Sequence, residues 1–131
     1  MYLGDSVQFA LNDEEFLNPA NFGSFMEFSI GKVNDVGPSM WRNMSMNNTP
    51  TGEVKGQKLE IKRYDTYTTY ELCMPWELLF GDGYVLNPDK RMRFSALVND
   101  NDDGNRGYVE YMSGIASVKS AGQFGLIEFV K

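Results

Sequence analysis

Along most of this chain, apolar and polar residues alternate with a period of two, and no other feature of the sequence restricts the fold as strongly. In the segment 6–11, Val7, Phe9 and Leu11 fall on one face of an extended chain, and the residues between them fall on the other. Further segments repeat this alternation, and turns rich in Gly, Asn and Pro separate them. The predicted strands are 6–11, 24–30, 40–46, 58–62, 69–74, 93–99, 108–112 and 125–130.

Many short strands with almost no helix are typical of an all-β fold. Only the segment 75–80 predicts a helical turn, with Pro75 at its first position, and we expect its Trp76 to belong to the core. The length of 131 residues is enough for one hydrophobic core but short for two domains. We therefore predict a single domain, residues 1–131, folded as an antiparallel two-sheet β-sandwich of jelly-roll or immunoglobulin-like architecture.

Charge and composition exclude several classes of function. The chain has 12 basic and 18 acidic residues and a net charge of −6, which argues against binding to nucleic acid or to an anionic membrane. No apolar run approaches the roughly 18 residues of a membrane span, so we predict no membrane insertion. The chain has no histidine, so it lacks the usual general base and the commonest ligand of zinc and haem. Cys73 is the single cysteine, which excludes an internal disulfide, and we predict no organic cofactor.

The segment 99–110 carries several residues of a calcium-binding EF-hand loop. With Asn99 at position one, Asp103, Gly104 and Glu110 fall at positions five, six and twelve. An EF-hand loop joins two helices, however, whereas both flanks of this segment alternate like strands. We therefore predict a hairpin connection and not an EF-hand.

Two interpretations of this connection remain open. In the first, it is a solvated polar turn in which Gly104 and Asn105 adopt positive φ angles. In the second, Asp100, Asp102 and Asp103 hold a structural calcium ion in another geometry, because crowded carboxylates repel one another unless they share a cation.

Four stretches of the sequence, taken in order, resemble a known family. They are 4–9 (GDSVQF), 70–79 (YELCMPWELL), 97–102 (LVNDND) followed by Arg106 and Gly107, and 124–129 (FGLIEF). Together they look like successive signature strands of family 9 carbohydrate-binding modules. The resemblance covers nearly the whole chain but starts after the family's first third, so we expect the opening strands of the family's domain to be missing. A missing strand exposes a sheet edge, which predicts strand-mediated pairing into a homo-oligomer.

The resemblance implies a β-sandwich that binds sugars, carries structural calcium and is attached to secreted glycoside hydrolases or cell-surface proteins. In the best-known members, two tryptophans hold a terminal sugar. Tyr2 occupies the position of the first tryptophan, and the segment 115–119, near the position of the second, has no aromatic residue. The family's polar contact positions correspond to Gln8, Glu27, Ser29 and Arg106. The resemblance therefore implies a preserved scaffold with altered sugar contacts.

Trp41 is the best aromatic platform that the alternation itself predicts. Sugar sites combine an aromatic face, which stacks on pyranose C–H groups, with planar polar side chains that bind the hydroxyls. Trp41 shares a predicted strand face with Asn43, whereas Met40, Met44 and Met46 take the core side. A tryptophan that only covers the rim of the core is the alternative.

A catalytic function is not predicted. Glycoside hydrolysis needs two opposed carboxylates in a cleft, and nothing in the sequence marks Glu27, Glu71 or Glu110 as buried. A serine or cysteine nucleophile would lack a histidine base, and no glycine-rich loop follows a strand into a helix. Two further alternatives are a structural or assembly sandwich without sugar affinity and a haem-binding electron-transfer sandwich with methionine and lysine ligands.

The sequence thus predicts a non-catalytic module, extracellular or on the cell surface, whose partner is a poly- or oligosaccharide. No segment has the form of a signal peptide, so we expect any export signal outside this sequence. The predicted sugar contacts are Tyr2, Gln8, Glu27, Ser29, Trp41 and Arg106, and the predicted calcium ligands are Asp100, Asp102 and Asp103. Plain solvent exposure of the same polar strand faces is the alternative.

Overall fold

The computed structural model of the chain describes residues 5–14, 25–46 and 49–130. The strands are β1 (Ser6–Asp13), β2 (Met26–Val33), β3 (Gly37–Met44), β4 (Gly52–Glu53), β5 (Lys58–Arg63), β6 (Thr68–Cys73), β7 (Met92–Asp100), β8 (Gly107–Tyr111) and β9 (Gly125–Ile127), and the helix is α1 (Trp76–Phe80). Within the described ranges, no helix has the length and apolar character needed to cross a membrane.

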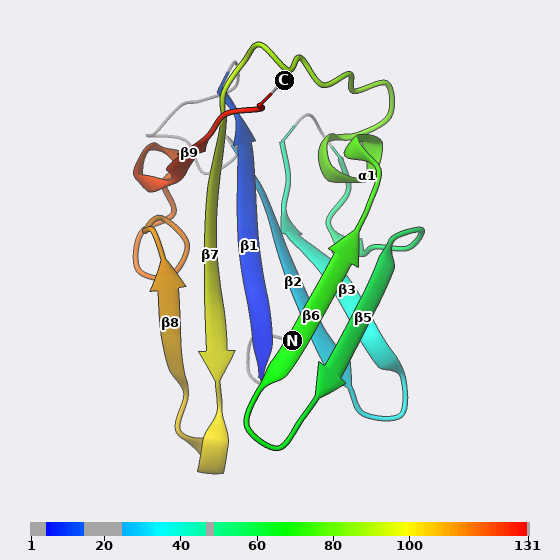
Figure 1. Cartoon of the computed structure of the whole chain (residues 1–131), viewed down its shortest axis with the longest axis vertical. Coiled ribbons are helices and arrows are strands. Elements are labelled where there is room, and N and C mark those ends of the chain that lie inside the picture. The colour runs from blue at the N-terminus through cyan, green and yellow to red at the C-terminus, as the bar shows by residue number, and fades with distance from the viewer. Residues whose placement is uncertain (1–4, 15–24, 47–48, 131) are drawn as a thin grey trace.

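The predicted antiparallel β-sandwich is confirmed (Figure 1). Among the described residues, the large sheet has seven strands in the order β4-β3-β2-β1-β7-β8, and β9 pairs with β7 beyond the end of β8. The second sheet is the hairpin β5-β6, which lies in front of the large sheet in Figure 1. The two layers are therefore very unequal in width.

Antiparallel pairing aligns the apolar positions of four strands across the large sheet. Val98 of β7 lies opposite Val7 of β1, Val7 lies opposite Ile30 of β2, and Ile30 lies opposite Met40 of β3. Residues directly opposite one another share a face of the sheet. The period-two patterns of separate strands thus combine into one apolar face, here called the inner face, which points toward the small sheet.

The core lies between the two sheets. Phe9 and Phe28 stack at ring centroids 5.2 Å apart, and burial of each such side chain contributes about 1.5–3 kcal/mol. Leu79 and Phe80 of α1 are buried against the same core. Trp76 packs there too, as predicted from its place between Pro75 and two leucines.

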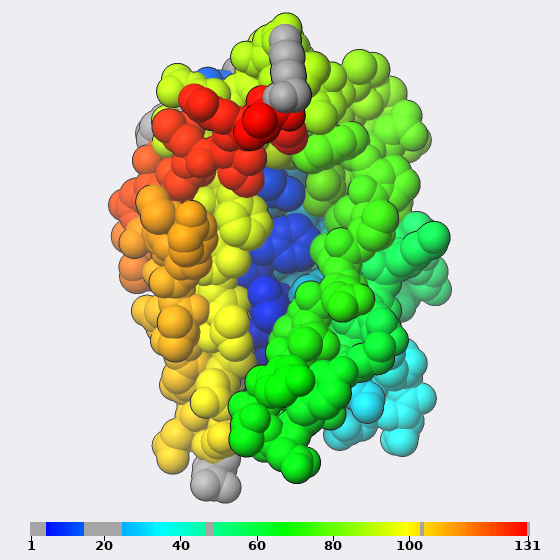
Figure 2. Space-filling model, viewed as in Figure 1, coloured from blue at the N-terminus to red at the C-terminus, as the bar shows by residue number. Residues whose placement is uncertain are grey.

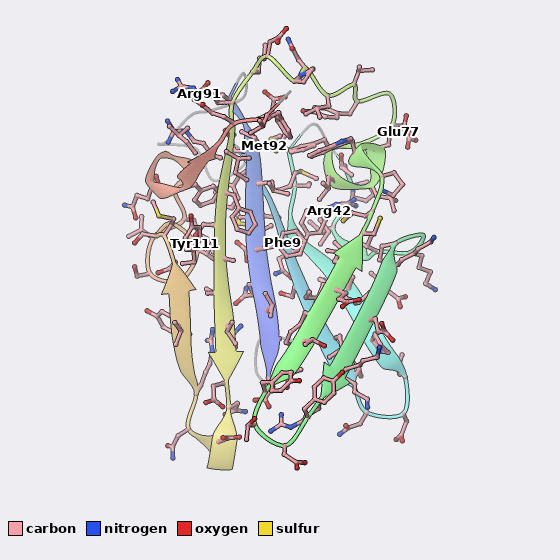
Figure 3. The ribbon with its side chains drawn as sticks, viewed as in Figure 1. Phe9, Arg42, Glu77, Arg91, Met92 and Tyr111 are labelled. Atoms are coloured by element: carbon pink, nitrogen blue, oxygen red, sulfur yellow. The ribbon has the colours of Figure 1, made fainter. Side chains whose placement is uncertain are left out.

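Arg42 of β3 places a guanidinium group in this core (Figure 3). Its Cζ lies 5.4 Å from the centroid of the Phe28 ring, and it donates hydrogen bonds to the carbonyl oxygens of Pro50 (2.8 Å) and Leu78. Burial lowers the pKa of Arg42, yet an arginine in a protein stays protonated near neutral pH. The buried cation therefore ties β3 to α1.

A second apolar cluster covers part of the opposite, outer face of the large sheet. In the segment 112–124, here called the covering loop, Ile115 and Phe124 pack with Ala10, Phe25 and Leu97. The rings of Phe25 and Phe124 meet edge to face at 5.1 Å. The large sheet is consequently buried on both faces in this region, which explains apolar residues at positions that strict alternation would leave to polar ones.

An irregularity in the pairing of β2 with β3 changes the face of one methionine. Glu27 lies opposite Met44, but its neighbour Phe28 lies opposite Arg42, so Asn43 is an extra residue in β3. The prediction that Met44 takes the core side is therefore wrong, because beyond this bulge its side chain joins the outer cluster. The methionines at 40 and 46 are buried in the core, as predicted.

The connection from β7 to β8 is a hairpin, as predicted, and no helix pair flanks it. It contains one 3-10 turn, Asp102–Gly104. Gly104 has a positive φ of 77°, as expected, whereas Asn105 has a φ of −97°. The expectation for Asn105 is wrong because its backbone is already extended as it leads into β8.

We expect Gly114→Ala to unfold the covering loop or the whole domain. Gly114 has a φ of 102°, and an added Cβ would overlap the carbonyl oxygen of Ser120 and the ring of Phe124. Gly104→Ala is the matched control, since its φ is 77° and nothing lies within 4 Å of the new Cβ, so only about 1–2 kcal/mol of backbone strain arises. Urea unfolding measures the stability of both variants. Equal losses of stability in the two would contradict the close packing of the covering loop.

Candidate functional site

The outer face of the large sheet has an open pocket of about 420 Å³ beside the covering loop. It contains four of the residues predicted to contact a ligand, and its lining is Gln8, Glu27, Trp41, Asn43, Met44, Arg106, Ile115, Ala116 and Lys119. Ser29, also predicted, lies directly behind this lining. Tyr2 lies outside the described residues, so its predicted role stays a prediction.

Strand register brings the predicted residues together. Gln8 of β1 lies opposite Ser29 of β2, and Ser29 lies opposite Trp41 of β3. Three residues spread over 33 positions of the chain thus form one row across the sheet. The bulge then turns both Asn43 and Met44 toward the pocket, which an unbroken strand would not do.

The carboxylate of Glu27 is the centre of a buried polar network. Glu27 is 2% exposed, and its Oε1 accepts hydrogen bonds from Gln8 Nε2 (3.1 Å) and Asn43 Nδ2 (3.3 Å). Its Oε2 forms an ion pair and hydrogen bond with Lys119 Nζ. Asn43 Nδ2 also donates to Ser29 Oγ at 2.6 Å. These partners satisfy a charge whose burial would otherwise be strongly unfavourable.

A second branch of the network holds Arg106 in place. Arg106 donates from Nη2 (2.9 Å) and Nε (3.3 Å) to Asn99 Oδ1. The buried Asn99 donates in turn to Gln8 Oε1 at 2.9 Å and to Ser6 Oγ at 3.2 Å. The guanidinium group, the amide of Gln8 and the carboxylate of Glu27 are therefore positioned by one continuous set of hydrogen bonds.

Trp41 supplies an apolar surface next to these polar groups. Its side chain is 47% exposed, and Met44, Ile115 and Ala116 add apolar area to the same pocket. An exposed aromatic face beside fixed amide, carboxylate and guanidinium groups suits a ligand that is apolar on one side and has several hydroxyl groups at its edge.

Several residues of the site were not among the predicted contacts. Asn43 shares the predicted strand face of Trp41, and this signal was available in the sequence. The sequence pattern places Asn99 only in the calcium-loop motif. Lys119 had no local signal, because it reaches Glu27 only when the covering loop folds back onto the sheet, across 92 positions of the chain.

Acidic residues gather at the opposite end of β1 from the covering loop. The carboxylates of Asp5, Asp100 and Asp102 offer oxygens that lie within 4.8 Å of one another, and all three residues are exposed. Asp5 also accepts a hydrogen bond from the backbone N–H of Asn101 (3.1 Å) and pairs with Arg63 (3.2 Å). Two predicted calcium ligands are thus adjacent, Asp5 is an addition, and the side chain of Asp103 lies outside the described residues.

The three glutamates considered for glycoside hydrolysis occupy different surroundings. Glu27 is engaged in the network, and Glu71 is exposed on β6 of the small sheet. Glu110 Oε1 accepts hydrogen bonds from the backbone N–H groups of Ile115 (3.3 Å) and Ala116 (3.2 Å), so it anchors the start of the covering loop.

Comparisons with protein-family models, with curated proteins and with solved structures found no match to this chain. The geometry of the pocket and the four family-like stretches of sequence are therefore the basis for proposing a function.

We expect Lys119→Met to destabilise the domain by about 2 kcal/mol, because it leaves the buried carboxylate of Glu27 without its cation. Lys55→Met is the matched control: its side chain is 81% exposed and pairs with Glu53 at 3.3 Å, so the loss should stay below about 1 kcal/mol. The double variant Glu27→Gln with Lys119→Met should recover part of the loss in urea unfolding. Equal stability of the two lysine variants would contradict the buried pair.

Proposed function

We propose that this chain is a non-catalytic carbohydrate-binding module that recognises a poly- or oligosaccharide in the pocket beside Trp41. The observation that carries the proposal is a half-exposed indole next to a buried, fully connected network around Glu27. The four stretches that resemble family 9 carbohydrate-binding modules support the same function, since Gln8, Glu27 and Arg106 of that resemblance line this pocket.

In the proposed complex, the C–H face of a pyranose ring stacks on Trp41. The hydroxyl groups at the ring edge exchange hydrogen bonds with Gln8, Asn43 and Arg106. The buried carboxylate of Glu27 holds the amides of Gln8 and Asn43 in position. Ser29 is 1% exposed and bonded to Asn43, so we assign it the role of positioning that amide. Because the network fixes these groups before the ligand arrives, binding costs little side-chain entropy.

An open pocket leaves water in competition for every hydroxyl group, so we expect weak binding by a single module. Attachment to a glycoside hydrolase or to a cell surface would raise the effective affinity through a high local concentration. We accordingly propose an extracellular or cell-surface location and an accessory role. The alternative is an assembly module without sugar affinity.

We expect Trp41→Ala to abolish retardation of the protein in affinity electrophoresis against a panel of soluble polysaccharides. Loss of the stacking surface should weaken binding by at least about tenfold, or about 1.4 kcal/mol. Tyr67→Ala is the matched control, because Tyr67 is an exposed aromatic residue outside this pocket and its removal should leave retardation unchanged.

Three results would speak against the proposed function. Absence of retardation on every glycan would favour the assembly module. Equal retardation of Trp41→Ala and the wild-type protein would place any sugar site elsewhere. Release of reducing sugar from the retained polysaccharide would replace a binding module by an enzyme.

We also propose that Asp5, Asp100 and Asp102 hold a structural calcium ion, as hard carboxylate oxygens favour this metal. At a concentration about a hundred times the dissociation constant, calcium should stabilise the fold by about 2.7 kcal/mol and raise Tm by about 10 °C. Asp102→Asn should remove this shift, whereas Asp82→Asn, an exposed aspartate outside the cluster, should keep it. A Tm that neither rises on addition of calcium nor falls again on addition of EDTA would contradict the proposal.

A further inference from the structure

The inner face of the large sheet is only partly covered by the small sheet. Val109 lies opposite Val98, and Tyr111 lies opposite Ala96, so β8 continues the inner face that begins at Val7 and Phe9. Val98, Val109 and Tyr111 are nevertheless 48%, 76% and 62% exposed. Phe9 is buried in the core, so the exposed part of this face lies on β7 and β8.

A groove runs between β7 on one side and β6 on the other, with β1 at its floor (Figure 2). A pocket of about 490 Å³ occupies the end near the β5-β6 turn, where Val7 and Val98 of the large sheet face Thr68 and Tyr70 of β6. We call this feature the inter-sheet groove. Its position is where a sandwich with two equal layers would have further strands.

One wall of the inter-sheet groove is a strand edge. β6 pairs with β5 along one edge, and among the described residues no strand pairs with its other edge. Backbone N–H and C=O groups along such an edge can pair with an added strand. An apolar face and a pairing edge thus border the same groove.

The end of the groove near the β5-β6 turn is acidic. The pocket there is lined by four aspartates and one arginine, namely Asp5, Asp65, Asp100, Asp102 and Arg63. Tyr64 and Tyr67, stacked at 4.6 Å, stand beside them at the tip of the hairpin. Carboxylates next to aromatic faces favour a cationic group.

We propose that the inter-sheet groove binds an extended β-strand of another polypeptide. The strand pairs with the free edge of β6, places alternate apolar side chains on Val98, Val109 and Tyr111, and carries a lysine or arginine at the end that reaches the aspartates. The charge selects this occupant over a second copy of the chain. A second copy carries a net charge of −6, so it does not supply the cationic strand end that the acidic end of the groove favours.

The test uses fluorescence anisotropy with a fluorescein-labelled octapeptide that has two lysines followed by alternating valine and threonine. The titration contains EDTA, because a calcium ion on Asp5, Asp100 and Asp102 would compete with the lysines for the same carboxylates. We expect saturable binding to the wild-type chain, and at least about tenfold weaker binding when the two lysines are replaced by glutamates. A peptide with alternate backbone nitrogens methylated should also bind at least about tenfold more weakly, since it has lost donors to the β6 edge.

Two variants locate the binding surface. Val109→Asp should weaken binding of the lysine peptide by at least about tenfold, because it puts a charge on the apolar face. Val85→Asp is the matched control, a valine that is 84% exposed and lies outside the groove, and should bind like the wild type. Both sites are exposed, so both variants should fold, and their urea unfolding curves verify this.

Absence of saturable binding would overturn the proposal, as would equal binding by Val109→Asp and Val85→Asp or full affinity of the methylated peptide. Sedimentation equilibrium of the chain alone tests whether a second copy of the chain occupies the inter-sheet groove. A dimer that Val109→Asp dissociates would assign the inter-sheet groove to self-association and overturn the proposal.

Discussion

The candidate site depends on the burial of one carboxylate. Glu27 lies on β2, in the middle of the large sheet, and water does not reach its side chain. Its charge must therefore be compensated by protein groups. Those groups are Gln8 of β1, Asn43 of β3 and Lys119 of the covering loop. The cost of leaving this charge unpaired is what joins the three segments into one pocket wall.

The same network explains why the pocket is well suited to recognition. Arg106 and Asn99 extend it toward the β7-β8 hairpin, and Trp41 borders it on the side of β3. The polar groups are oriented by one another instead of by the ligand, while the indole stays half exposed. A rigid set of donors and acceptors beside an aromatic face is the arrangement that an open sugar site requires.

The two faces of the large sheet are covered to different extents, because the large sheet is much wider than the small sheet. On the outer face, the covering loop buries one region and leaves the pocket beside Trp41. On the inner face, the small sheet covers β2 and β3 but leaves Val98 and Val109 exposed. The two proposed sites therefore lie on opposite faces, so occupancy of one does not block the other.

The sequence by itself determined most of the strands, the hairpin between β7 and β8 and the side of its own strand on which each of Gln8, Ser29 and Trp41 lies, because side chains of an extended chain alternate regardless of what packs on them. Tertiary structure decided the rest. The bulge at Asn43 turned Met44 outward, the covering loop brought Lys119 to Glu27, and the approach of β1 to β7 placed Asp5 beside Asp100. These contacts join positions far apart in the chain, where pairing register and burial act, and no local pattern encodes either.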